Sequence, residues 1–354
     1  MWQFQIHDTA TGQLLDRVSP ASGSWTRRLS GEGSGSHTFR LSDADYPRDV
    51  WRDLLKTWER TLVVCWAYPG VIGPIYAGII TDSSYDYASG TVTVNHAGIR
   101  SLLDARLTFA NGNYSSGSLT INDKSPWGAL RRILDRATEN VSRGLPFDYS
   151  FLPDTAGDIS LSWSAPQVAT IADCITDLEA LGYETNFVPQ FMNDHQFSWA
   201  PTIGSRLEGP TVEATLTAQD APFSDVSVKI DGTDRATSVF ASGNGSGVDM
   251  VVGWAPAGMP IGTVALERTT QAKRQQESLS GVAAAEYALH SSDTVQWSFT
   301  VDINGGEFTP ASFVPSNLVR VHTWGDPWLA DMVRSLRVVA LAGDMTFRLR
   351  PEVQ

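Results

Sequence analysis

Apolar and polar residues follow the pattern of β-strands through most of this chain. Near its start three apolar runs, Leu62–Tyr68, Ile75–Ile80 and Thr91–His96, are separated by Pro-Gly, Gly-Pro and Ser-Gly dipeptides. Glycine permits positive φ and proline fixes φ, so these dipeptides mark turns between strands rather than a helix. The pattern predicts an antiparallel meander, followed by a short helical turn over Ile99–Leu103.

Two further features belong to the same N-terminal region. Trp2–Ile6 and Gln13–Val18 flank a Thr-Gly pair, which predicts an opening β-hairpin. The glycine-rich stretch 30–36 lacks the lysine and the glycine spacing of a phosphate-binding loop, so we interpret it as a flexible connection. Together with the meander, these elements predict a first β domain over residues 1–106.

One helix is predicted inside this domain. Over Arg48–Trp58 the apolar residues Trp51, Leu54, Leu55 and Trp58 recur at the spacing of one helical face. Aromatic residues at that spacing are usually core residues, so the helix is expected to cover the sheet. A sugar-stacking role is the alternative for the two tryptophans.

Residues 107–210 differ in composition and predict an inserted α+β domain. Residues 107–124 are rich in Asn, Gly and Ser and are interpreted as a linker or long exposed loop. A helix is predicted to start at Ser125, which can cap it, with Pro126 in the first turn. A second helix over 168–181 begins at a capping-box pattern and ends at a glycine. Strands are predicted at Ile159–Trp163, Glu184–Val188 and Gln196–Ala200.

Strand patterns return after this insertion and predict a second β domain over residues 211–354. The clearest is Val295–Val301, where apolar and polar residues alternate strictly. Residues 268–290 favour helix but contain Gly281, which predicts two helical pieces on either side of it. The chain is therefore predicted to be mainly β with an α+β insertion. The other predicted strands are Val212–Leu216, Val226–Ile230, Ser238–Ala241, Leu318–Thr323, Ser335–Leu341 and Thr346–Arg350.

Charge and composition narrow the classes of function. The formal net charge of −13 at pH 7 repels phosphate groups, so nucleic-acid binding and docking to anionic lipid are disfavoured. No stretch approaches the ~20 apolar residues of a membrane span, and the N-terminus lacks a secretory signal, so we expect a soluble chain made in a cytoplasm. Cys65 and Cys174 are interpreted as small buried hydrophobic residues, with a disulfide or a reactive thiol as the alternative.

No catalytic or metal-binding pattern accompanies these elements. The six histidines are scattered, and none stands in an HxH or HExxH spacing. No G-x-S-x-G elbow of a serine hydrolase is present. A glycosidase pair among the 39 carboxylates is not excluded, because such a pair is defined by distance in space. We therefore predict no catalytic residue, no metal and no cofactor.

Five stretches together carry a resemblance to a known family. They are LSDADYPRDVWRDLLKTWERTLVVCW, IYAGIITDSSYDYASGTVTVNHAGIRSLLDARL, SVFASGNGSG, LERTTQAKRQQESLSGVAAAEYAL and FTPASFVPSNLVRVHTWGDPWLADMVRSLRVVALAGDMTFRLRP. In their order and spacing they resemble the minor tail proteins, or tail hubs, of long-tailed (siphovirus) phages of actinobacteria. Those proteins are similar to the baseplate hubs of contractile-tailed phages.

The resemblance implies a fold and an assembly. In that family two β-barrel domains, separated by an α/β insertion, pack around a three-fold axis, and three chains form a ring between the tail tube and the tip. It implies a non-enzymatic homotrimer in the virion, at the tail tip, made in the bacterial host cytoplasm. Its implied partners are the distal tail protein, the tape measure protein and the tail tip or fibre proteins, with DNA passing through the lumen without specific binding.

Interfaces between subunits would bury aromatic residues. Trp324, Trp328, Trp51 and Trp58 are the candidate interface residues, and packing within their own domain is the alternative for each. Two other functions remain open. Twelve tryptophans on β domains suit a carbohydrate-binding module that recognises the host surface. A cell-wall hydrolase would need a pocket with paired carboxylates or a zinc site.

Overall fold

The structure is a computed structural model, and it divides the chain into two compact units. The larger unit contains residues 1–225 and 299–354, and the smaller contains 226–298. The residues described are 1–44, 46–68, 71–109, 114, 117–139, 143–243, 251–256, 264–271, 278–304 and 307–354.

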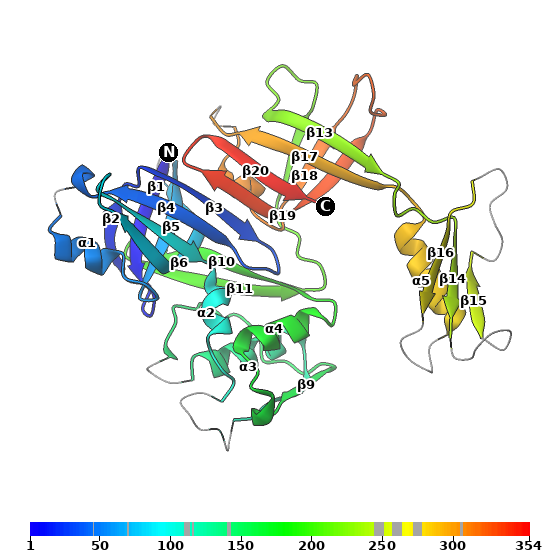
Figure 1. Ribbon diagram of the computed structural model, residues 1–354, viewed down its shortest axis with the longest axis horizontal. Coiled ribbons are helices and arrows are strands. Elements are labelled where there is room, and N and C mark those ends of the chain that lie inside the picture. Colours follow the sequence, from blue (N-terminus) through cyan, green and yellow to red (C-terminus); the bar gives the residue numbers. More distant parts are fainter. Residues whose placement is uncertain are drawn as a thin grey trace. The chain divides into compact units, whose positions relative to one another are not determined.

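One extended sheet organises most of the strands (Figure 1). Its hydrogen-bonded order is β13-β17-β20-β19-β3-β4-β7-β6-β5-β1-β2, and β18 joins β12 to β19 beside this path. The path does not close on itself among the described strands. The chain is thus mainly β, as predicted. The strands are β1 Trp2–Asp8, β2 Leu14–Val18, β3 Ser22–Arg28, β4 Ser34–Arg40, β5 Arg60–Tyr68, β6 Val71–Asp86, β7 Thr91–Ala97, β12 Thr211–Thr215, β13 Phe223–Asp231, β17 Thr294–Asp302, β18 Leu318–His322, β19 Val333–Asp344 and β20 Arg348–Val353.

The predicted hairpin and meander are confirmed. β1 and β2 pair antiparallel around Gly12, whose φ of 73° is the left-handed conformation that glycine favours. β5, β6 and β7 form consecutive antiparallel pairs, and α2, Ile99–Asp104, follows them. β6 is 16 residues long and exceeds the predicted strand at both ends, because its polar second half continues to pair with β7. Gly73 and Pro74, predicted as a turn, lie inside it and pair with Trp66 and Cys65 of β5, so that prediction is wrong. The predicted Pro69-Gly70 turn lies outside the described residues.

The interpretation of residues 30–36 as a flexible connection is wrong at its C-terminal end. β4 begins at Ser34 and pairs with β3 and with β7. Gly35 is needed there for close packing, because an added Cβ would lie 2.4 Å from the ring of His96 and from the carbonyl oxygen of Ser24. The glycines in this stretch therefore permit close approach between strands.

The helix predicted over Arg48–Trp58 is shorter in the structure. α1 spans Arg48–Leu54, and Leu55 caps it. Trp58 lies beyond the helix with a φ of 63°, which removes it from the helical face. The prediction failed because apolar spacing continued past the point at which the backbone turns into β5.

The middle of the chain packs two helices against the sheet. α3, Pro126–Ala137, starts at the predicted cap Ser125, and α4, Ile171–Glu179, starts at the predicted Thr170 capping box. The last part of the predicted 107–124 loop is instead a strand, β8, Leu119–Lys124, which pairs with β9, Ile159–Trp163. The other strands of this region are β10 Glu184–Asn193 and β11 Gln196–Gly204.

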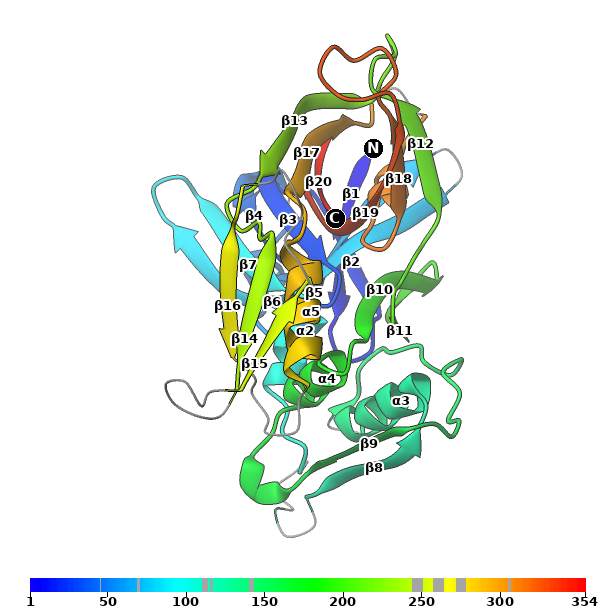
Figure 2. The same cartoon turned by 90° about the vertical axis from the view of Figure 1, so that its right-hand side faces the viewer.

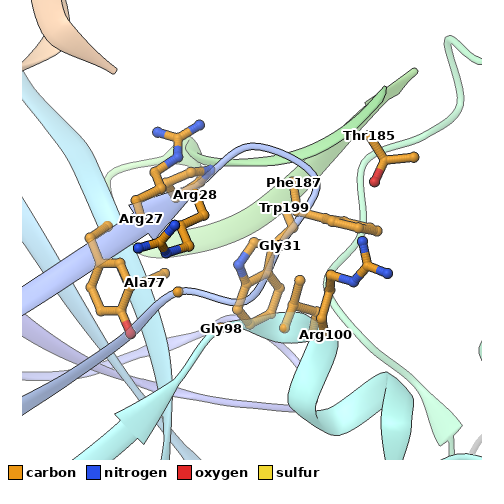
Figure 3. A pocket seen from close by; sticks show the side chains of 13 residues that line it. Arg27, Arg28, Gly31, Ala77, Gly98, Arg100, Thr185, Phe187 and Trp199 are labelled. Carbon is orange, nitrogen blue, oxygen red and sulfur yellow. The ribbon is translucent and has the colours of Figure 1, made fainter. Parts of the chain in front are cut away.

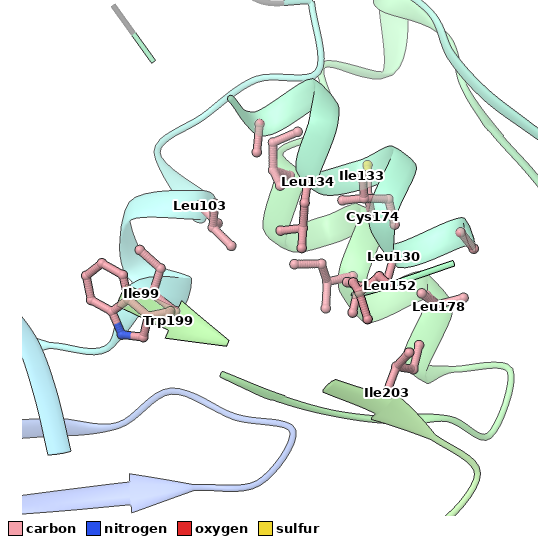
Figure 4. Packing of buried hydrophobic residues seen from close by; sticks show 14 of the residues in the cluster. Ile99, Leu103, Leu130, Ile133, Leu134, Leu152, Cys174, Leu178, Trp199 and Ile203 are labelled. Atoms are coloured by element: carbon pink, nitrogen blue, oxygen red, sulfur yellow. The ribbon is translucent and has the colours of Figure 1, made fainter. Parts of the chain in front are cut away.

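A single core joins this region to the sheet. Figure 4 shows side chains of α3 and α4 directed at each other, with Ile99 and Leu103 of α2 and Trp199 of β11 beside them. The same buried cluster includes Val63 and Ile79 of the meander. The three-part division at residues 106 and 210 stays a prediction, and this core runs across its first boundary.

The C-terminal strands extend the sheet. β12 pairs parallel with β18, and β19 pairs with β18 through its first half and with β3 through its second. β19 continues to Asp344, past the predicted end at Leu341, because residues 340–344 form the ladder with β3. β20 begins at Arg348 rather than at the predicted Thr346.

The smaller unit is a three-stranded sheet with one helix beside it (Figure 2). β14, Ser238–Ser242, lies between β15, Val252–Ala255, and β16, Glu267–Gln271. α5, Leu279–His290, is one helix through Gly281, so the predicted break there is wrong. Gly281 lies in the first turn and donates its N–H to the Ser278 cap, where glycine is tolerated. The start of the predicted helical segment is β16, and residues 272–277 lie outside the described residues.

Two predictions about individual features have clear outcomes. Cys65 and Cys174 are both unpaired and buried, as predicted, and burial raises the pKa of each thiol to about 12. Within the described ranges, no helix is both long and apolar enough to cross a membrane.

Candidate functional site

Two of the four candidate tryptophans project from the loop between β18 and β19. Trp328 is 83% exposed and Trp324 is 54% exposed. The Trp324 indole lies edge-on to the ring of His322, with ring centroids 4.6 Å apart. Single exposed apolar side chains are normal on a globular protein, but two indoles on one short loop place apolar area together, so this loop is a candidate contact surface.

Internal hydrogen bonds hold this loop in one shape. The Asp326 carboxylate accepts the backbone N–H groups of Trp328 at 2.9 Å and Leu329 at 2.7 Å. These bonds lower the pKa of Asp326, so it stays ionised at neutral pH. Asp331 accepts the N–H of Gly325 at 2.9 Å, and the Thr323 hydroxyl donates to the Ala330 carbonyl at 2.6 Å. The exposed indole therefore stands on a preformed turn.

Trp51 is buried and lines a groove beside α1. Its ring packs against Phe39 at 5.9 Å and against Tyr46 at 5.2 Å, which fits packing within its own domain. Its indole nitrogen has no hydrogen-bond partner among the described residues. The groove has a volume of about 680 Å³ and runs between α1 and the β6–β7 hairpin. Its lining is Leu41, Tyr46, Arg48, Trp51, Arg52, Leu55, Lys56, Thr57, Ser83, Tyr85 and Val92.

The charge of the groove lining is opposite in sign to the net charge of the chain. Its lining contains three cationic side chains and no carboxylate, although the net charge of the protein is −13. Arg48 pairs with Asp49, and Lys56, just after the helix, pairs with Glu59 at 2.5 Å; all four side chains are exposed. No ion pair joins Arg52 to another described residue, and its side chain is exposed.

Trp58 contributes nothing to this groove. Its side chain is 43% exposed, and its backbone N–H donates to the Ile80 carbonyl at 2.6 Å. Of the four tryptophans, only Trp324 and Trp328 therefore share a surface, the loop between β18 and β19, while Trp51 and Trp58 lie apart from it and from each other's surroundings. Their role as interface residues stays a prediction.

A buried histidine pair lies within the sheet of the larger unit. His37 Nδ1 and His96 Nε2 are 2.8 Å apart, and the Tyr76 hydroxyl is 3.0 Å from His96 Nδ1. Burial lowers the pKa of His37 to about 4, and burial together with His37 lowers that of His96 to about 3. Both rings are therefore neutral at pH 7. Gly23 makes room for the pair, because a Cβ there would lie 2.1 Å from the His37 ring.

A small cavity between the extended sheet and strands β10 and β11 is lined by the buried guanidinium group of Arg27. Figure 3 shows Arg27, Arg28 and Arg100 around it, with Trp199 beside them. Arg27 donates to the Ile75 carbonyl at 3.2 Å and to the Asn186 side chain at 3.4 Å, and burial lowers its pKa to about 10. The cavity volume of about 40 Å³ accommodates water molecules rather than a substrate.

The geometry contains no metal centre in the part of the chain that the structure describes. No group of three His, Cys, Asp or Glu side chains there could hold an ion. His322 lies against Glu213 and is separated from the other histidines. Sequence reasoning missed the cationic groove. The spacing of Arg48, Arg52 and Lys56, four residues apart, was the available signal.

Comparison with known proteins finds relatives in structure only. No protein-family model and no curated protein sequence matches this chain. A 43 kDa tail protein of prophage MuSo2 from Shewanella oneidensis is similar over 99% of this chain and 97% of its own, with a TM-score of 0.56 and 13% identity. A tail protein from Neisseria meningitidis MC58 is similar over 99% and 96%, with a TM-score of 0.53 and 12% identity.

A third similar structure comes from the Francisella PdpA–VgrG complex. The match covers 100% of this chain and 58% of the other, with a TM-score of 0.56 and 9% identity. At these identities the likeness concerns the fold. The chain has a fold found in phage tail proteins, and it spans nearly the full length of two of them.

Proposed function

We propose that this chain is a structural component of a phage tail tip. Three copies form a hub ring that joins the tail tube to the tip and receptor-binding proteins and lets DNA pass. The observation that carries the proposal is the fold likeness to two tail proteins over almost the whole of each chain. The finer assignment to actinobacterial long-tailed phages rests on the sequence resemblance.

The proposed architecture has two barrel-like β domains, 1–106 and 211–354, on either side of the α+β insertion 107–210. Assembly around a three-fold axis brings such domains into a ring of six. The distal tail protein, the tape measure protein and the tip or fibre proteins contact the ring. A net charge of −13 supports a lumen that repels phosphate groups, so DNA passes without being held.

Labelling of intact particles tests this placement. Gold-conjugated antibody against this chain should bind at the tail tip of the phage that encodes it, next to the distal end of the tube. Label along the tube, at the capsid or absent from purified particles contradicts the proposal. Antibody against the major tube protein provides the control for access to the tail.

One observation favours a second candidate, a carbohydrate-binding module that recognises the host surface. Trp328 stands exposed beside Asp326 on a preformed loop, the combination that stacks on a sugar ring and accepts its hydroxyl hydrogens. Binding of the purified chain to host-wall glycans, lost in Trp328→Ala and retained in Trp58→Ala, supports this candidate. Equal binding by both variants, or none by the native chain, rejects it.

A further inference from the structure

The loop between β18 and β19 and the groove beside α1 have complementary properties. The segment Trp324–Asp331 presents two exposed indoles and two carboxylates, and it contains no cationic residue. The groove presents aromatic rings, three cationic side chains and no carboxylate. We propose that the Trp328 loop of one copy of this chain inserts into the α1 groove of the next. This inference rests on the proposed hub function and names its subunit contact.

Size and chemistry fit one another. A groove of about 680 Å³ lies within the range of ~300–1,000 Å³ that holds small ligands and inserted side chains, and it exceeds one indole. Tyr46, Trp51 and Tyr85 supply apolar and aromatic walls for Trp328. Trp, Tyr and Arg are also the side chains that dominate protein interfaces.

The charges of the two surfaces also favour insertion of the Trp328 loop into the groove. With Trp328 in the groove, the carboxylates of Asp326 and Asp331 face the cationic side of α1. Arg52 has no ion-pair partner among the described residues, so it is the cation that a second copy can engage without breaking an existing pair. On insertion, Arg48 and Lys56 exchange their present partners, Asp49 and Glu59, for the carboxylates of the loop. The present pairs are exposed and contribute little to stability.

A copy cannot fill its own groove, because the two surfaces lie at opposite ends of one strand. β19 begins two residues after Asp331, and its 12 residues span roughly 40 Å at about 3.3 Å per residue. Its far end, Asp344, pairs with Ser24, which pairs with Ser36 of β4. β4 then continues away from the loop to Arg40, and α1 follows.

The contact joins two different surfaces, a loop on one copy and a groove on the other. Repeated head to tail, a contact of this kind closes into a ring when its rotation returns to the first subunit, whereas two copies that fill each other's grooves form a two-fold dimer. A three-subunit ring is one closed solution. The preformed turn at Asp326 reduces the ordering cost of inserting the loop.

Disulfide trapping tests the contact directly. The variant with both Thr57→Cys, in the groove lining, and Ala330→Cys, in the loop, keeps Trp328 and Arg52 and, when oxidised, should give covalently linked dimers and trimers. The matched control replaces Ala330 and Leu181, an exposed residue after α4, with cysteine. The native cysteines are buried thiols with raised pKa values, so they do not contribute. We expect cross-linking at least about 10-fold faster than in the control, and equal rates overturn the inference.

Charge reversal gives an independent measurement. Arg52→Glu should weaken association of the native chain at least about 10-fold, while Arg206→Glu, at another exposed arginine, should leave it unchanged. A trimer of the native chain that is insensitive to both variants rejects this contact and leaves the hub proposal standing. A native chain that stays monomeric and fails to cross-link counts against both.

Discussion

Two of the packed clusters among the described residues are built from side chains of different size. The cluster under α3 and α4 contains Leu, Ile, Phe and Trp side chains contributed by helices, by β11 and by the meander. The cluster in the smaller unit consists of Val239 and four alanines, Ala236, Ala241, Ala255 and Ala283. Burying a Leu, Ile or Phe side chain contributes about 1.5–3 kcal/mol, and alanine contributes far less.

The difference indicates how each unit is stabilised. In the larger unit, residues distant in sequence share one dense core, so its strands and helices depend on one another. Among its described residues the smaller unit fully buries only small apolar side chains, with Leu279, Val282 and Tyr287 partly buried against them, so it relies mainly on its strand ladder and on α5. We expect it to open at a lower denaturant concentration than the larger unit, so that unfolding of the whole chain is not two-state.

The largest expected effect is at Trp199 in the larger core. Trp199 is 2% exposed and packs edge-on against Phe197, with ring centroids 4.6 Å apart. Trp199→Ala should lower the free energy of unfolding of the larger unit by about 3–5 kcal/mol, because it leaves a cavity in a packed core. Urea unfolding followed by circular dichroism measures this. Leu181→Ala, at a 52% exposed residue, is the control, and it should change stability by less than about 0.5 kcal/mol.

The next largest expected effect is a loss of stability of the larger unit on acidification. Burial lowers the pKa of His7 and of His37 to about 4 each, and that of His96 to about 3. The unfolded chain binds more protons than the folded chain below about pH 6.5, so stability is full above that pH and falls as the pH drops toward these values. His37 alone accounts for about 2 kcal/mol at pH 5.

Proton NMR of the histidine rings checks this prediction. The Cε1–H signals of these three residues should show no titration between pH 8 and pH 5.5. The smaller unit contains one histidine, His290, so acid should affect its unfolding less. Titration of any of the three rings near pH 6.5 contradicts the assignment of a neutral buried ring.

A smaller effect is expected from Val239 in the other core. Val239 is fully buried in β14, and Val239→Ala removes two methyl-sized groups worth about 0.8 kcal/mol each. The loss of about 1.6 kcal/mol should fall on the smaller unit alone. Hydrogen exchange resolves the two units, since amides of α5 should exchange faster while those of α3 keep their protection. Faster exchange in both units would show that the cores are coupled.

The smallest effects compare the helix caps of the two units. Thr170 caps α4 and Ser278 caps α5, each accepting a backbone N–H through its hydroxyl, at 3.0 Å from Asp173 and 3.3 Å from Gly281. Replacing either by alanine should cost about 1 kcal/mol. Each substitution should therefore raise opening of its own unit by a similar factor, while the amides of α5 should exchange faster than those of α4 in the native chain and in both variants. Slower exchange in α5 than in α4 would contradict the proposed difference between the cores.

Elements with local signals could be predicted from the sequence. The caps at Ser125 and Thr170, the alternation in β17 and the turn at Ser89-Gly90 in the meander all depend on residues close in sequence. β3 was missed because its SGSWTRR sequence carries almost no apolar alternation. Its stability comes from β4, β19 and the His37 ring that packs over Gly23, which are contacts made by residues distant in sequence.

The candidate surfaces show the same limit. The exposed tryptophans could be identified from sequence as candidates, but burial of Trp51 and the turn at Trp58 depend on tertiary packing. The groove forms only where α1 meets the β6–β7 hairpin, whose extra length was not predictable from its polar residues.

The mass and symmetry of the purified protein test directly whether three copies of this chain form a ring. Light scattering with negative-stain imaging should give a particle of three times the chain mass, seen as a hollow ring with three-fold symmetry. The chain should be measured alone and with its distal tail protein. A particle of one chain mass under both conditions, with no ring in the images, would contradict the proposed trimeric hub.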